Sequence, residues 1–139
     1  MADQPRPPER TSGADARRPR ALEQPVAAFD LDDELDRLTA EPEWSGRDRN
    51  ALTLAKSSSF RVVLVALRGG ARVGEDEAHG PMSVQVFRGA VTVRRSNEAA
   101  ELSAGQLGTM EAGGPWSVTA RDASAILLTI SWPEERSLV

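Results

Sequence analysis

Short segments with β-strand patterning, each followed by a turn signal, fill the second half of this sequence and constrain its fold most strongly. Two segments, Arg61–Leu67 and Ala125–Ile130, are almost continuously apolar, and the first has the β-branched composition of a strand buried on both faces. Shorter segments alternate apolar and polar residues: 82–87, 91–94 and 116–121. Glycine, proline, asparagine or aspartate separates them at Gly69-Gly70, Gly80-Pro81, Arg88-Gly89, Ser96-Asn97, Gly113-Gly114-Pro115 and Asp122. This pattern predicts an all-β domain of the sandwich or jelly-roll type from Asn50 to Trp132.

The first 48 residues differ in composition and divide into two parts. Residues 1–28 are rich in proline, arginine and alanine, and their apolar residues are too sparse to offset the entropy of ordering the chain. We therefore predict a disordered tail there. Over residues 29–40, four apolar side chains recur at near-helical spacing: Phe29, Leu31, Leu35 and Leu38. We expect a short acidic helix with Asp30 as its N-cap, ended by Pro42. The predicted boundaries are 1–28 for the tail, 29–48 for the helix and connector, and 49–139 for the β domain.

Composition and charge exclude several classes of function. The 139 residues include no cysteine and one histidine, His79, which rules out thiolate chemistry and the multi-imidazole shells favoured by zinc, copper and non-haem iron. With a net charge of −4, nucleic-acid binding would need a local basic patch, and we interpret Arg17, Arg18 and Arg20 as part of a solvated linker rather than a polyanion-binding arm. No apolar stretch has the length of a secretory signal or a membrane span. We expect a cytoplasmic protein with no nucleic-acid and no membrane partner.

Two glycine-framed segments carry a resemblance to a known family. Residues 70–89 and 105–120 resemble the paired motifs of the cupin superfamily. The first family motif is Gly, five residues, His-x-His, three or four residues, Glu, six residues, Gly, and with the three-residue gap it runs here from Gly70 to Gly89. The second is Gly, five residues, Pro-x-Gly, two residues, His, three residues, Asn; it starts at Gly105 and keeps Gly113. The resemblance implies a cupin-type jelly-roll β-barrel, preceded by the short helix and the tail.

The residue types at the family's metal-ligand positions depart from the motif. In metal-bearing cupins two His, a Glu and a later His hold a metal ion in the barrel mouth. The matching positions here are Asp76, Ala78, Met82 and Trp116, and Glu111 stands at the motif proline. One carboxylate among four such positions cannot retain a transition metal against water. These departures from the family motif therefore predict a cupin-type barrel that holds no metal and no cofactor.

A displaced metal site is the alternative, in which Asp76 would be joined by Glu75, Glu77 or His79 from the same loop. Neighbouring residues on a strand point to opposite faces, so these side chains cannot all converge by local geometry. His79 falls one residue past the second ligand position, and a one-residue slip reverses its face. We interpret His79 as a solvent-facing loop residue.

The predicted ligand pocket consists of the residues at the departing positions: Asp76, Ala78, Met82, Glu111 and Trp116. A mostly apolar concavity with few polar groups is typical of small-molecule sites. The opposing interpretation is that Met82 and Trp116 fill the mouth as core residues.

Two classes of function follow from this pocket. We expect a metal-free, non-catalytic cupin-domain protein that binds a small apolar or mixed-polarity organic ligand, or a protein partner. We also expect a homodimer, because the apolar runs at 61–67 and 125–130 would leave sheet edges that need cover. The alternative is a cupin enzyme of the isomerase or dioxygenase type, with a rearranged metal site or acid–base chemistry by Asp76 and Glu111.

Overall fold

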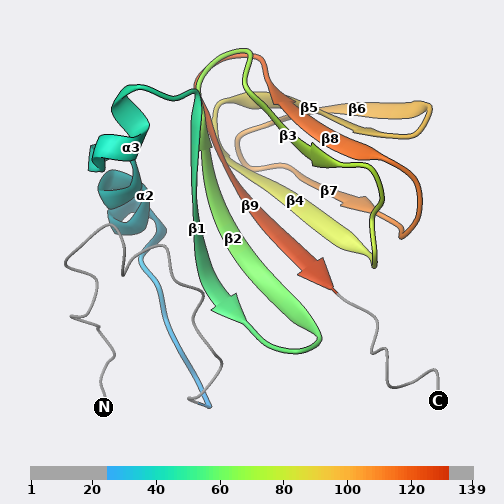
Figure 1. Cartoon of the computed structure of the whole chain (residues 1–139), viewed down its shortest axis with the longest axis horizontal. Coiled ribbons are helices and arrows are strands. Elements are labelled where there is room, and N and C mark those ends of the chain that lie inside the picture. The colour runs from blue at the N-terminus through green and yellow to red at the C-terminus, as the bar shows by residue number, and fades with distance from the viewer. Residues whose placement is uncertain (1–24, 132–139) are drawn as a thin grey trace.

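The protein is represented by a computed structural model that describes residues 25–131 (Figure 1). In this range, two helices precede nine strands. The helices are α2 (Leu31–Ala40) and α3 (Pro42–Ser45). The strands are β1 (Arg49–Lys56), β2 (Phe60–Leu67), β3 (Arg72–Glu75), β4 (Met82–Arg88), β5 (Ala90–Arg95), β6 (Glu98–Ser103), β7 (Leu107–Met110), β8 (Trp116–Ala120) and β9 (Ser124–Ser131). The predicted tail at 1–28 lies almost entirely outside the described residues. Within 25–131 no helix is long and apolar enough to cross a membrane.

The strands form two antiparallel sheets that pack face to face. The larger sheet has the order β1-β2-β9-β4-β7, and the smaller has the order β3-β8-β5-β6. Figure 1 shows the smaller sheet leaning over one face of the larger sheet, with α2 and α3 beside β1. Strand exchange between the two sheets is the arrangement of a jelly roll. The all-β prediction is confirmed.

The two long apolar strands lie inside the larger sheet, which corrects the expectation that they would leave sheet edges to be covered. β2 is flanked by β1 and β9, and β9 by β2 and β4. The edges are formed by β1 and β7 in one sheet and by β3 and β6 in the other. The expectation was wrong because an apolar run shows that a strand is buried but does not identify its neighbours. The homodimer remains a prediction, but the two apolar strands no longer support it, because they are not at a sheet edge.

β2 is buried on both faces, as its continuous apolar run predicts. Val65 and Leu67 point between the sheets, where they join the main apolar cluster. Leu64 and Ala66 point to the other face, where Leu38 of α2 packs against them with an exposed fraction of 0%. Burying one such leucine stabilises the fold by roughly 1.5–3 kcal/mol. The helix therefore serves as the outer cover of the larger sheet.

Local capping explains where the helices begin and end. Oδ1 of Asp30 accepts a hydrogen bond from the Asp33 N–H at 3.0 Å, which confirms the predicted N-cap. α2 ends at Ala40, before Pro42 as expected. Pro42 then starts the one-turn helix α3 instead of an irregular connector. Proline favours the first turn of a helix because its missing N–H would have no partner there. Nδ2 of Asn50 donates to the Leu38 carbonyl at 3.0 Å and so joins the end of α2 to β1.

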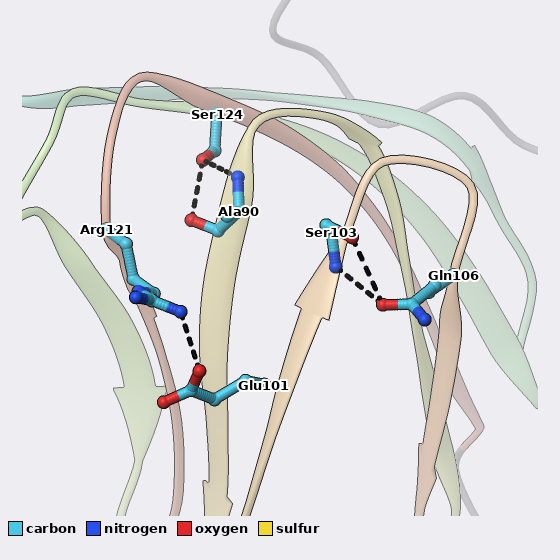
Figure 2. Close-up of polar contacts among 6 residues, drawn as sticks. All are labelled: Ala90, Glu101, Ser103, Gln106, Arg121 and Ser124. Carbon is cyan, nitrogen blue, oxygen red and sulfur yellow. Dashed lines mark hydrogen bonds and ion pairs between the residues drawn. The ribbon is translucent and has the colours of Figure 1, made fainter.

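Polar contacts hold one end of the barrel, where β4 and β6 end and β5, β7 and β9 begin (Figure 2). The backbone N–H of Ala90 donates to Oγ of Ser124 at 3.1 Å, and the same Oγ lies 3.1 Å from the Ala90 carbonyl oxygen. Nη1 of Arg121 lies 2.6 Å from Oε1 of Glu101. Gly89, between β4 and β5, has a φ of +82°, and a Cβ there would lie 2.3 Å from a backbone carbonyl oxygen. Only glycine fits this turn, which confirms that this motif glycine marks a strand reversal.

Candidate functional site

We call the opposite end the barrel mouth; β4 and β8 begin there, and β7 and β9 end there. Ala78, Met82 and Trp116 come together at this end within the main apolar cluster, with exposed fractions of 2%, 5% and 5%. Asp76 and Glu111, the other two residues of the predicted pocket, are exposed. The structure thus brings the three apolar residues together inside the barrel and leaves the two carboxylates at its surface.

Trp116 carries the one polar group among these three side chains. Its Nε1 is buried and has no hydrogen-bond partner within residues 25–131. An indole N–H can only donate, so an acceptor for it would have to come from outside this part of the chain. Leaving such a donor unsatisfied costs about 1–3 kcal/mol.

The strand register shows which other residues share the inward face with Trp116. Residues directly opposite each other in an antiparallel pair point to the same face of the sheet. Glu75 and Arg95 are the cross-strand partners of Trp116. Glu75, the last residue of β3, therefore has the register of the inward face, but its side chain is exposed. Asp76 follows the end of the strand and is exposed as well.

The larger sheet contributes a second inward row at the mouth. Met82 lies opposite both Met110 and Ile130, and Ile130 lies opposite Arg61. Arg61 in turn lies opposite Lys56 of β1. The sequence analysis did not identify Lys56, Arg61 and Arg95 as residues whose register places them on the inward side of their strands. The sequence could have indicated the inward position of Arg61. Alternate residues of a strand point to the same face, and Arg61 alternates with Val63 and Val65, which face the core.

Two loops, 76–81 and 111–115, join over the mouth, and we call them the mouth loops. The N–H of Ala78 donates to the Gly114 carbonyl at 2.9 Å, and the N–H of Gly113 donates to the Ala78 carbonyl at 2.7 Å. The Arg95 guanidinium holds the second loop by donating from Nε to the Glu111 carbonyl at 2.9 Å and from Nη2 to the carbonyl of the next residue at 2.6 Å. These hydrogen bonds tie the two loops to each other and to Arg95 at the end of the barrel where β8 begins with Trp116.

The residues at the family's metal-ligand positions do not fit a metal ion. Three of them are apolar and buried, and Asp76 is exposed. Across residues 25–131, no three His, Asp or Glu side chains are grouped so that they could hold a metal. His79 is exposed in the first mouth loop.

A groove of about 480 Å³ lies on the outer face of the larger sheet at the same end. Ser83, Thr109 and Thr129 line it; they are cross-strand partners on β4, β7 and β9 and point away from the barrel. Met82 and Glu111 also contribute to its lining, whereas Trp116 does not. Two of the five predicted pocket residues therefore meet at this groove, on the opposite face of the sheet from the indole.

No family model and no curated protein matches the sequence. Solved structures do match, with low sequence identity. A cupin superfamily protein from Desulfitobacterium hafniense has a TM-score of 0.57 and 15% identity, over 60% of this chain and 77% of that one. A Streptococcus pyogenes protein of unknown function has a TM-score of 0.61 and 20% identity, over 86% of this chain and 98% of that one.

An enzyme is also among the similar structures. Salicylate 1,2-dioxygenase from Pseudoaminobacter salicylatoxidans has a TM-score of 0.68 and 20% identity, over 86% of this chain and 37% of that one. The present chain thus spans little more than a third of the dioxygenase. Similarity at this level of identity concerns the fold and not the activity. It agrees with the two-sheet topology and with the spacing of the motif glycines: the chain has a cupin-type jelly-roll fold.

Proposed function

We propose that this protein is a metal-free, non-catalytic binding module that takes a small organic ligand at the barrel mouth. The observation that carries the proposal is the buried Nε1 of Trp116, which has no hydrogen-bond partner within residues 25–131. It lies among apolar side chains at the place where the family motif puts metal ligands. A ligand oxygen that accepts this hydrogen bond would remove a cost of about 1–3 kcal/mol.

The surroundings of the indole favour binding over catalysis. Ala78 and Met82 supply apolar surface but no acid, base or nucleophile. Met82 and Met110 are unbranched and flexible, so they can move aside for a ligand at low cost. The two exposed carboxylates, Asp76 and Glu111, have no described contact with the indole. The protein partner, the homodimer and the cytoplasmic location stay predictions of the sequence.

Native mass spectrometry of the full chain, purified without denaturation, tests the proposal. We expect a retained organic mass that is lost in Trp116→Phe and kept in Trp44→Phe, a matched change at a half-buried tryptophan outside the mouth. Metal analysis of the same sample addresses the enzyme alternative. Near-stoichiometric metal, lost on changing Asp76 or Glu75, would contradict the proposal and favour a rearranged metal site.

A further inference from the structure

Among the sheet edges within residues 25–131, only the strand β7 carries no charge. Natural edge strands are often protected against pairing with another chain by charged side chains or proline. The other three edge strands, β1, β3 and β6, each contain two charged residues. β7, with the sequence LGTM, contains neither a charged residue nor a proline. Its edge is therefore suited to accept a further strand.

The register of β7 against β4 shows which of its backbone groups face the open side. The Val86 N–H donates to the Gln106 carbonyl at 3.0 Å, and hydrogen-bonded pairs alternate along an antiparallel ladder. Gly108, two residues further on, is therefore bonded to β4, whereas the N–H and C=O groups of Leu107 and Thr109 point away from it. These outward groups have no hydrogen-bond partner within residues 25–131.

The side chains beside this open edge add an apolar contact and a negative charge. Leu107 is 60% exposed, and no other large apolar side chain of the nine strands is exposed. Thr109 and Glu111 line the groove of about 480 Å³ on the outer face of the same sheet. The Glu111 carboxylate is exposed and forms no ion pair within residues 25–131, since Arg95 donates to its backbone carbonyl instead.

We infer that β7 binds an extended peptide segment of a partner protein as an added antiparallel strand. The segment has a basic residue opposite Thr109 and, two positions later, an apolar residue opposite Leu107. Directly opposite residues share a face of the sheet, so the apolar side chain covers Leu107. The long basic side chain lies over the groove and reaches diagonally toward Glu111. This surface is separate from the Trp116 indole, so the inference goes beyond the proposed function and does not depend on it.

A peptide suits this edge better than a second copy of the chain. Pairing over the four residues of β7 alone buries far less than the roughly 1,200 Å² of a stable protein–protein interface. The β7 strand of a second copy also brings no basic residue to face Glu111. A peptide adds its own side chains to the groove, and its basic residue complements the carboxylate.

The peptide acetyl-Thr-Arg-Thr-Val-Thr-amide tests the pairing on the full chain by hydrogen exchange measured with NMR. In the free protein, the amides of Leu107 and Thr109 should exchange at least tenfold faster than that of Gly108. Saturating peptide should slow both at least tenfold and leave Gly108 unchanged. N-methylation of the peptide's arginine or valine, whose N–H groups would face β7, should abolish binding. N-methylation of the central threonine, whose N–H faces away, should leave the affinity within threefold.

Variants of the protein test the side-chain contacts. Leu107→Lys, which puts a charge on the edge, should weaken peptide binding at least fivefold. Glu111→Gln should weaken it about two- to fivefold, as expected for an exposed ion pair, and replacing the peptide's arginine by neutral citrulline should then cause no further loss. Ala99→Lys and Glu98→Gln are the matched controls, because both residues are exposed on the edge strand β6 of the other sheet. Neither control should change the affinity.

Three results would overturn the inference. Binding that survives N-methylation of the arginine and the valine would show that no strand is added. Unchanged exchange at Leu107 and Thr109 with saturating peptide would show that the edge does not take this segment. Protection of these amides without peptide would assign the edge to a second copy if it rises with protein concentration, and to a segment of this chain if it does not. None of these results affects the ligand proposed at Trp116, which native mass spectrometry tests separately.

Discussion

Two substitutions at Trp116 separate the energetic roles of its ring and its N–H. Trp116→Ala removes a side chain that is 5% exposed and packed in the main cluster. Deleting a buried tryptophan costs about 3–5 kcal/mol, as lost transfer energy plus the cavity left behind. Trp116→Phe keeps most of the ring but removes Nε1, which has no partner within residues 25–131. Relief of an unsatisfied donor returns about 1–3 kcal/mol.

The phenylalanine variant should therefore come close to the wild type. The smaller ring loses the area of about two methylene groups, or roughly 1.6 kcal/mol, which the relieved donor offsets. We expect a net change within about 1 kcal/mol for Trp116→Phe and a loss of 3 kcal/mol or more for Trp116→Ala. Urea unfolding followed by far-ultraviolet circular dichroism measures both, since the loss of the backbone signal reports unfolding in each variant.

Trp44→Phe supplies the comparison, because this half-buried ring stacks under the Arg68 guanidinium at 4.1 Å and lies outside the mouth. It should lose about 0.5–1 kcal/mol through the weakened cation–π contact. A loss at Trp116→Phe as large as at Trp116→Ala would refute the reasoning. That result would mean the indole N–H already makes a strong hydrogen bond in the free protein.

Three further substitutions test the turns, the cap and the mouth loops. Gly89→Ala should lose at least about 2 kcal/mol in urea unfolding, more than Gly70→Ala, because both have positive φ but only Gly89 has a carbonyl oxygen within 2.3 Å of the new Cβ; equal losses would contradict the clash. Asp30→Ala should cost about 1 kcal/mol in the same assay by removing the N-cap, and Asp30→Ser should restore most of it. Arg95→Gln should speed hydrogen exchange of the Trp116 indole N–H by releasing the second mouth loop, and an unchanged rate would show that the loop does not control access.

Local patterns predict much of this fold because they act within a few residues. The alternation in 82–87 sets one face of β4 toward the core, and the observed burial follows it. The N-cap at Asp30 needs only the next three residues. The order of strands in a sheet is different, since it depends on pairings between distant segments. β1 illustrates this: its sequence, RNALTLAK, has mixed polarity, yet it covers the edge of β2 that an apolar run alone suggested would be open.

The same distinction explains what was missed at the mouth. Ala78, Met82 and Trp116, which the motif spacing predicts to lie at the mouth, all belong to the main apolar cluster, and positive-φ glycines mark the turns beside their strands. Spacing within a motif says nothing about β1 and β2, which lie before both motifs. The register of β2 against β9 is what brings Arg61 level with Ile130, and the register of β1 brings Lys56 level with Arg61. These two charged residues thus come from strands outside the motifs, and their positions depend on the pairing of distant segments, which motif spacing cannot predict.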